Sequence, residues 1–124
     1  MKTVTEHFTS IVVGMIAAGF MLAGSAIATD MPPLAEQYGC THCHAIDKTV
    51  VGPAWVDVSR RYHGTSKYIT KNGTEYPLKT YLAKKVSMGG NGNWGVVPMV
   101  ANDPGGSRQA GIKELVEFIL LLRQ

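Results

Sequence analysis

The feature that most constrains this chain is the run Cys40-Thr41-His42-Cys43-His44, which has the pattern C-x-x-C-H. This pattern is typical of the covalent attachment of a c-type haem. Two thiols at this spacing can add to the two vinyl groups of one porphyrin, and the histidine that follows is then held beneath the iron. We therefore predict that Cys40 and Cys43 are thioether anchors, that His44 is an axial ligand, and that the fold is built around the macrocycle.

Three other interpretations of the two cysteines have to be weighed. A thioredoxin-like dithiol belongs to a βαβ unit, whereas residues 34–39 and 45–51 carry no parallel-strand pattern. A zinc site needs a second ligand pair, and after residue 28 the only histidines besides His44 are His42 and His63. A plain disulfide stays open, because export would favour one.

The N-terminal segment 1–28 has the pattern of an export signal. Lys2 precedes an apolar run over Ile11–Ala28, which ends in the A-x-A sequence Ala26-Ile27-Ala28. We predict cleavage after Ala28, which leaves residues 29–124 as one domain in the periplasm, where covalent haem attachment takes place. An uncleaved membrane anchor is the alternative, because the run is close to the lower length limit for a membrane span.

The net charge limits the kinds of partner, and the cysteine count limits what can stabilise the fold. The formal net charge is +3, which suggests an acidic protein partner and is too weak to indicate nucleic-acid binding. Both cysteines lie in the motif, so none remains for a disulfide framework. A domain of this size has a marginal core, and a buried macrocycle would enlarge it.

Apolar residues at helical spacing predict an all-α fold of about four short helices around one haem. The expected helices are one that starts at Pro32-Pro33 and breaks near His44, one over Ala54–Tyr62, one carrying Leu78 to Val86, and one carrying Ile112 to Leu122 with Ser107 as its N-cap. Residues 67–77 differ, because β-favouring residues flank Asn72-Gly73, the dipeptide of a type I′ hairpin turn. A small β-hairpin is therefore expected there.

The sixth position on the iron decides what such a protein does. A methionine thioether there makes an electron carrier, whereas an open position allows ligand or peroxide chemistry. The candidates are Met99, Met88, Met31 and His63. Met99 follows Pro98 in an apolar segment directly after the glycine-rich stretch 87–95, and a proline stiffens such an arm.

Residues 29–124 resemble the class I c-type cytochromes, in particular the small bacterial monohaem c-551/c-552 group. Three stretches carry the resemblance: the C-x-x-C-H motif, the sequence from His44 to Ala54 that contains Val51-Gly52-Pro53, and Trp94-Gly95-Val96-Val97-Pro98-Met99. The resemblance implies the cytochrome c fold, one haem c and one-electron transfer.

The resemblance also assigns roles to single residues. It implies His44 and Met99 as the axial ligands and the carbonyl of Pro53 as acceptor for the His44 N–H. It implies a hydrogen bond from the Trp94 indole to a haem propionate, a similar role for Lys85, and contact of Asn102 with the methionine sulfur. Two features depart from the group: Val100-Ala101 stands where prolines are usual, and the segment 65–77 is longer. If this segment packs near the propionate edge, it would restrict solvent access there.

The function expected from these observations is that of a monomeric periplasmic electron carrier, not an enzyme, since no catalytic constellation accompanies the haem. Its partners would be redox proteins with acidic docking surfaces, steered by Lys48, Lys84 and Lys85; a membrane would be involved only if the signal stays uncleaved. One alternative is a dedicated cytochrome subunit of a periplasmic oxidoreductase complex, such as a sulfur-compound dehydrogenase. Another is a haem sensor or peroxidase with an open sixth position.

Overall fold

The structure, a computed structural model, describes residues 29–122, so the predicted signal at 1–28 lies outside the described residues. Its elements in chain order are α1 (Pro33–Gln37), a 3₁₀ turn η1 (Cys40–His42), α2 (Trp55–Arg61), β1 (Lys67–Ile69), β2 (Glu75–Pro77), α3 (Leu78–Met88) and α4 (Gln109–Leu121). The prediction of four short helices and one hairpin is confirmed, but the first helix ends at Gln37 and does not continue to His44 as predicted. Within 29–122 no helix has the length and apolar character needed to cross a membrane.

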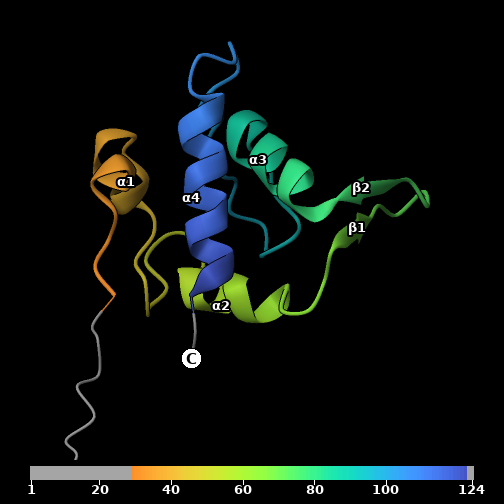
Figure 1. The fold of residues 1–124 in the computed structure, drawn as a ribbon, viewed down its shortest axis with the longest axis horizontal. Helices are drawn as coiled ribbons and strands as arrows, with labels where there is room; N and C mark the ends of the chain where they lie inside the picture. Colours follow the sequence, from red (N-terminus) through yellow and green to blue (C-terminus); the bar gives the residue numbers. More distant parts are fainter. Residues whose placement is uncertain (1–28, 123–124) are drawn as a thin grey trace, which may run out of the picture.

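Helix α4 is the central element of the fold. Figure 1 shows α1 on one side of it, α3 on the other and α2 across its C-terminal end. The predicted apolar stripe of α4 supplies the core on both sides, since Leu115 packs with Ala35 and Trp55, whereas Ile112 and Val116 pack with Ala83. An apolar stripe at this spacing buries one face of a helix against its neighbours, so one helix joins the other three.

The crossing of α1 and α4 depends on Gly111. A Cβ atom at this position would lie 2.8 Å from Cε2 of Tyr38, the residue that ends α1. The absence of a side chain therefore lets the two helices approach closely. The guanidinium of Arg108 covers the Tyr38 ring with its Cζ 5.0 Å from the centroid.

The start of α4 differs from the prediction. Ser107 makes no capping bond to the helix, so that prediction is wrong. Instead Asp103, only 4 % exposed, accepts hydrogen bonds from the Arg108 amide at 2.9 Å, from Gln109 Nε2 at 2.9 Å and from Ser107 Oγ at 3.3 Å. Burial by itself would raise the pKa of the Asp103 carboxyl, but these donors outweigh it and hold the pKa below its usual value.

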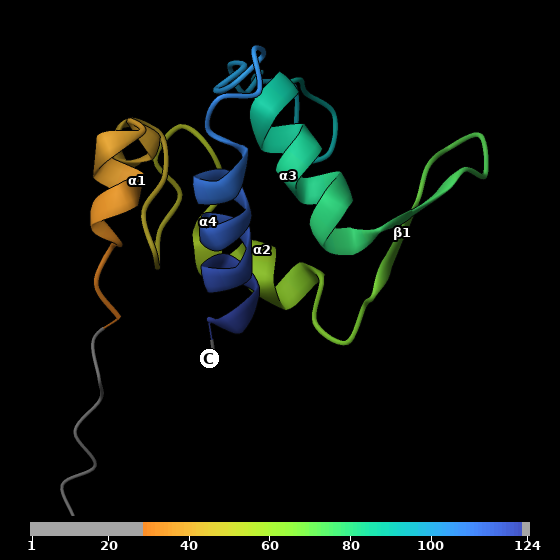
Figure 2. The same cartoon turned by 45° about the horizontal axis from the view of Figure 1, so that its top comes forward.

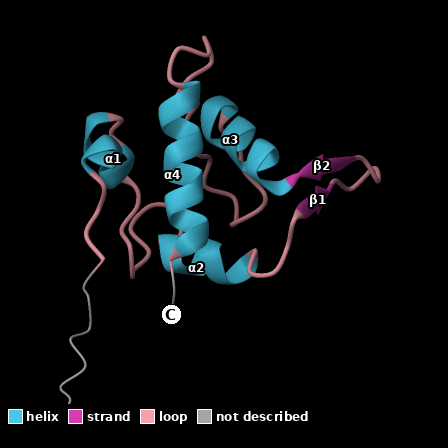
Figure 3. Ribbon diagram, in the orientation of Figure 1, coloured by secondary structure: helices cyan, strands magenta, loops and turns pink. Residues whose placement is uncertain are grey.

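The hairpin projects sideways from the helices in both Figure 1 and Figure 2. Its strands pair Tyr68 with Tyr76 in antiparallel register (magenta in Figure 3). The predicted type I′ turn is wrong, because positive φ occurs at Gly73 (φ 83°) and at no described non-glycine residue, Asn72 included. The Gly73 amide donates to the carbonyl of Thr70 and the Thr70 amide to that of Thr74, at 2.9 Å each, which is the pattern of a three-residue loop with a glycine bulge.

Candidate haem-binding site

A cavity of about 480 Å³ opens between α2, α3, α4 and the loops that connect them. This volume is within the range of pockets that hold organic cofactors, and apolar side chains such as Leu82, Leu115 and Ile119 dominate its lining. The lining includes all eight residues that the sequence predicts for the site: Cys40, Cys43, His44, Pro53, Lys85, Trp94, Met99 and Asn102. Residues from four separate stretches of the chain are thus brought to one cavity.

The C-x-x-C-H motif is folded tightly upon itself. Gly39, in the left-handed region with φ 74°, turns the chain out of α1 and into η1. The amides of Cys43 and His44 donate to the carbonyl of Cys40 at 3.1 and 2.9 Å. Both cysteines are free thiols and partly buried, and burial raises the pKa of the Cys40 thiol. The two thiols and the imidazole therefore face the cavity from a single turn of chain.

The imidazole of His44 is oriented by its own neighbours. Its Nδ1 lies 2.8 Å from the carbonyl oxygen of Pro53. Because a carbonyl can only accept a hydrogen bond, Nδ1 carries the proton and the lone pair of Nε2 is left for a metal. Gly52 packs against the ring, since a Cβ there would lie 3.0 Å from both ring nitrogens and closer still to Cε1.

The chain returns to the cavity through Met99. Helix α3 ends at Met88 and is followed by Gly89, and Gly90 then exchanges two backbone hydrogen bonds of 2.9 Å with Met99. Of the four candidate sixth ligands, which all belong to the described part of the chain, Met99 alone lines the cavity. Met88 is 56 % exposed, His63 is exposed and Met31 packs beside α1.

Lys85, Trp94 and Asn102 surround the same cavity in different ways. Lys85 projects from α3, and Trp94 is 43 % exposed beneath the guanidinium of Arg61, whose Cζ lies 4.5 Å from the ring centroid. The Asn102 amide nitrogen donates to the carbonyls of Val86 at 3.2 Å and Val100 at 3.0 Å. Asn102 thus fastens the chain after Met99 to the end of α3, and its contact with the Met99 sulfur stays a prediction.

The donor set fits a haem. A thiol pair, an imidazole with a free Nε2 and a thioether meet in one apolar cavity, and these are the groups that hold haem c. Residues 29–122 contain no cluster of three or more His, Cys, Asp or Glu side chains that could hold a metal ion by themselves. The zinc interpretation therefore has no ligand set in this part of the chain.

Two residues near the cavity were not anticipated from the sequence. Arg61, on α2, covers Trp94, and Asn93, in the glycine-rich stretch, is hydrogen-bonded to the tyrosines of α3 and the hairpin. No local pattern marks either residue, because the partners are far apart in the chain.

Comparison with known proteins agrees with the geometry. No profile of a known protein family matches the chain. Cytochrome c-551 of Allochromatium vinosum is 38 % identical over 106 residues, which cover 86 % of this chain and 98 % of that protein. Cytochrome c-552 of Hydrogenobacter thermophilus is 35 % identical over 109 residues, which cover 88 % of this chain and 96 % of that protein.

The fold is similar to a solved structure of the same kind. The crystal structure of Nitrosomonas europaea cytochrome c552 superposes with a TM-score of 0.59 at 34 % identity, covering 73 % of this chain and 96 % of that one. The expected cytochrome c fold is thereby confirmed. The chain belongs to the family of small bacterial cytochromes c-551 and c-552, which are monohaem electron carriers and not enzymes.

Proposed function

We propose that this protein carries single electrons between redox proteins of the periplasm, with one haem c attached through Cys40 and Cys43 and with His44 and Met99 as axial ligands. The observation that carries the proposal is the meeting of these four side chains in one apolar cavity, with the His44 Nδ1 engaged by Pro53. The haem supplies the reversible one-electron couple. Every other requirement falls on the polypeptide.

The polypeptide would hold the two axial ligands in place. The bond from His44 to Pro53 fixes the imidazole and raises its basicity. The two backbone hydrogen bonds between Gly90 and Met99 fix the chain at Met99, and the hydrogen bonds of Asn102 fix the chain directly after it. A site that keeps both axial bonds in both oxidation states has little to reorganise, which suits electron transfer.

We further propose export by cleavage after Ala28, action as a monomer and transient docking to acidic partners. The net charge of +3 supports the last point, together with the exposed Lys48 and Lys84 and with Lys85 at the cavity. Transient redox complexes bury little surface, so the transfer rate should fall as salt screens these charges. A rate independent of ionic strength would contradict this mode of docking.

The axial ligand is tested by expressing the full chain in a host that attaches haem and comparing Met99→Ala with Met88→Ala. Met99→Ala should abolish the charge-transfer band between methionine sulfur and ferric iron and allow carbon monoxide to bind the reduced protein at neutral pH. Met88→Ala, at the exposed C-terminal end of α3, should change neither. Persistence of the band in Met99→Ala contradicts the ligand assignment, and a colourless protein with two thiols free to alkylate contradicts the whole proposal.

A further inference from the structure

Residues 89–99, here termed the ligand loop, fold back upon themselves. At the base of the loop Gly90 and Met99 exchange two hydrogen bonds of 2.9 Å, and nearer the tip the Gly92 amide donates to the Gly95 carbonyl at 2.8 Å. Asn93 and Trp94 form the tip. The glycines 89, 90, 92 and 95 all have positive φ, so the loop has little stiffness of its own and its tip depends on what holds it from outside.

Side chains from three other elements converge on Asn93 at this tip. Arg61 of α2 donates from Nη1 to the Asn93 backbone carbonyl. The Asn93 Nδ2 donates to the Tyr81 hydroxyl of α3 at 2.8 Å, and the Tyr68 hydroxyl of β1 lies 3.4 Å from Asn93 Oδ1. One asparagine is therefore held at its backbone and at both ends of its amide.

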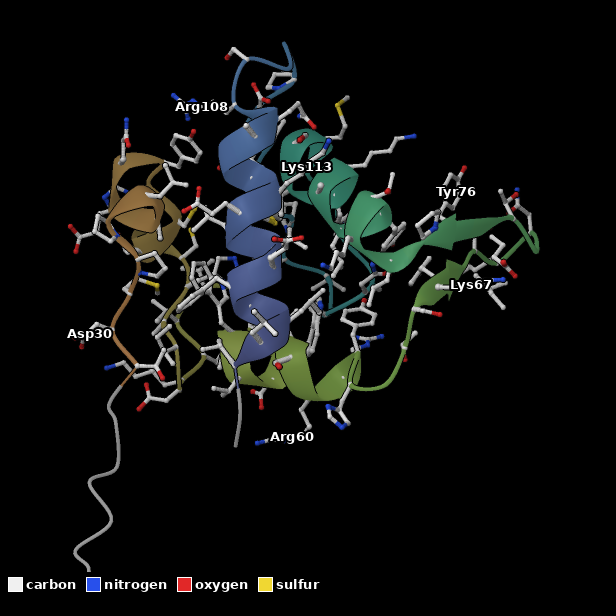
Figure 4. The ribbon with its side chains drawn as sticks, in the orientation of Figure 1. Asp30, Arg60, Lys67, Tyr76, Arg108 and Lys113 are labelled. Carbon is white, nitrogen blue, oxygen red and sulfur yellow. The ribbon has the colours of Figure 1, made fainter. Side chains whose placement is uncertain are left out.

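The hairpin takes part through stacking of its Tyr68 on α3. The rings of Tyr68 and Tyr81 lie 3.6 Å apart with an angle of 7° between their planes, and the hydrogen bond with Tyr81 is the main cause that raises the pKa of Tyr68. Tyr76, the cross-strand partner of Tyr68, is labelled on β2 in Figure 4; its ring is tilted and 6.5 Å from Tyr81, and its hydroxyl makes none of the contacts to Asn93. Of the two hairpin tyrosines, Tyr68 therefore stacks on Tyr81, the residue that is hydrogen-bonded to Asn93, and Tyr76 does not.

We propose that the hairpin is a clamp that acts through Tyr68 and Tyr81 on Asn93 and thereby positions Trp94, a partly exposed residue of the cavity wall. The role follows from the order of contacts: hairpin, α3, loop tip, cavity lining. Tyr68 and Tyr81 do not line the cavity, and Asn93, which does, is not among the residues assigned to hold the haem. All three are therefore positioning residues. The proposal rests on the proposed function in one respect, namely that the cavity lined by Trp94 is the haem site.

The hairpin can be removed without stretching the chain. The Leu78 amide donates to the Ser66 carbonyl at 2.9 Å, so the hairpin begins and ends at one hydrogen bond. A β-turn with two central residues closes the same bond. Replacing residues 67–77 by Asn-Gly therefore preserves the entry into α3 while it removes Tyr68.

The clamp is tested by amide hydrogen exchange in the full, haem-loaded protein. Tyr81→Phe should raise the exchange rate of the Gly92 amide about fivefold, the factor that corresponds to the ~1 kcal/mol of one net hydrogen bond. Tyr68→Phe should raise it less, because its bond is longer, and the Asn-Gly replacement should raise it at least as much as Tyr68→Phe. Tyr76→Phe is the matched control and should leave it unchanged.

A second measurement separates positioning from general stability. The Met99 amide, bonded to Gly90 at the loop base, should keep its exchange rate in every variant. The midpoint potential should fall in Tyr81→Phe and not in Tyr76→Phe, because water admitted beside a displaced Trp94 stabilises the ferric charge.

Equal Gly92 exchange in Tyr81→Phe and Tyr76→Phe would overturn the clamp, and so would a parallel rise at Met99, which marks loosening of the whole fold. Haem content, measured apart by the pyridine haemochrome spectrum, tests the proposed function. Pigmented variants with unchanged Gly92 exchange contradict the clamp alone.

Discussion

Gly52→Ala is the change that most directly probes how the protein orients His44. The φ of Gly52 lies outside the positive region, so the backbone accepts alanine without strain. The new methyl group would stand 3.0 Å from both ring nitrogens, where ordinary contact begins at 3.4 Å, and closer still to Cε1. The imidazole must therefore retreat by at least 0.4 Å at its nitrogens and by more at Cε1.

Two costs follow from this displacement. Overpacking of a close-fitting site costs about 1–3 kcal/mol, and weakening the 2.8 Å bond from Nδ1 to Pro53 adds up to about 1 kcal/mol. We expect the free energy of unfolding, measured by guanidinium titration followed at the haem band, to fall by about 2–3 kcal/mol. A weaker bond at Nδ1 also makes the imidazole less basic and destabilises the ferric state, so the midpoint potential should rise.

Gly105→Ala is the matched control, because Gly105 has no positive φ and a Cβ there meets nothing within 4 Å. It should change the free energy of unfolding by no more than about 0.5 kcal/mol and leave the potential alone. If Gly52→Ala behaves like Gly105→Ala in both measurements, the close packing of His44 on Gly52 has no energetic weight and the reasoning is refuted.

Three further changes follow from the packing. Gly111→Ala drives a methyl group into the Tyr38 ring at the crossing of α1 and α4, so the free energy of unfolding should fall by about 1–3 kcal/mol; an unchanged thermal midpoint would show that the crossing yields without cost. Asp103→Asn tests the lowered pKa of the Asp103 carboxyl. The ionised carboxylate stabilises the fold at neutral pH, and this stabilisation is lost as the pH falls through the folded-state pKa, which lies below the ordinary value of 3.8. Urea unfolding should thus separate parent and variant at pH 7 and bring them together in acid, and a pH-independent difference would contradict the shift. Gly89→Ala places a Cβ against the Met99 carbonyl and should weaken the sulfur-to-iron band, whereas Gly92→Ala, also at positive φ but in open space, controls for backbone strain alone.

The parts of the fold that follow a local rule were predictable. The C-x-x-C-H motif contains its two thiols and its imidazole within five consecutive residues. The apolar residues from Ile112 to Leu122 recur with the period of a helix that is buried on one face. That the other predicted residues line the same cavity was expected from the resemblance to the c-551/c-552 group, because no local rule says which segments of the chain meet.

The errors arose where a second segment decides the outcome. Ser107 is a residue type that often caps helices. Here, however, a turn closed by the hydrogen bond from the Gly106 amide to the Asp103 carbonyl places the Asp103 carboxylate at the start of α4, where it accepts the hydrogen bond of the Arg108 amide. Asn72-Gly73 has the chemistry of a type I′ turn, but the pairing of Thr70 with Thr74 leaves three residues in the loop and positive φ at the glycine only. Residue propensity describes one position, whereas the start of α4 and the hairpin turn each depend on a pair of residues that hydrogen-bond to each other.

The contacts that hold the tip of the ligand loop could not be predicted from the sequence. Arg61 reaches Asn93 across 32 positions, and Tyr68 reaches it across 25. Periodicity places each side chain on its own element but does not say which elements are neighbours. The positioning of Trp94 is therefore a property of the assembled fold.

The hydrogen bond between Ser66 and Leu78 has a consequence for how the protein tolerates change in length. The two ends of the intervening peptide are already neighbours. The entropic cost of closing a longer loop between them therefore grows only with the logarithm of its length. A peptide tag or a reporter could be grafted at the exposed turn around Lys71 while the helices keep their spacing.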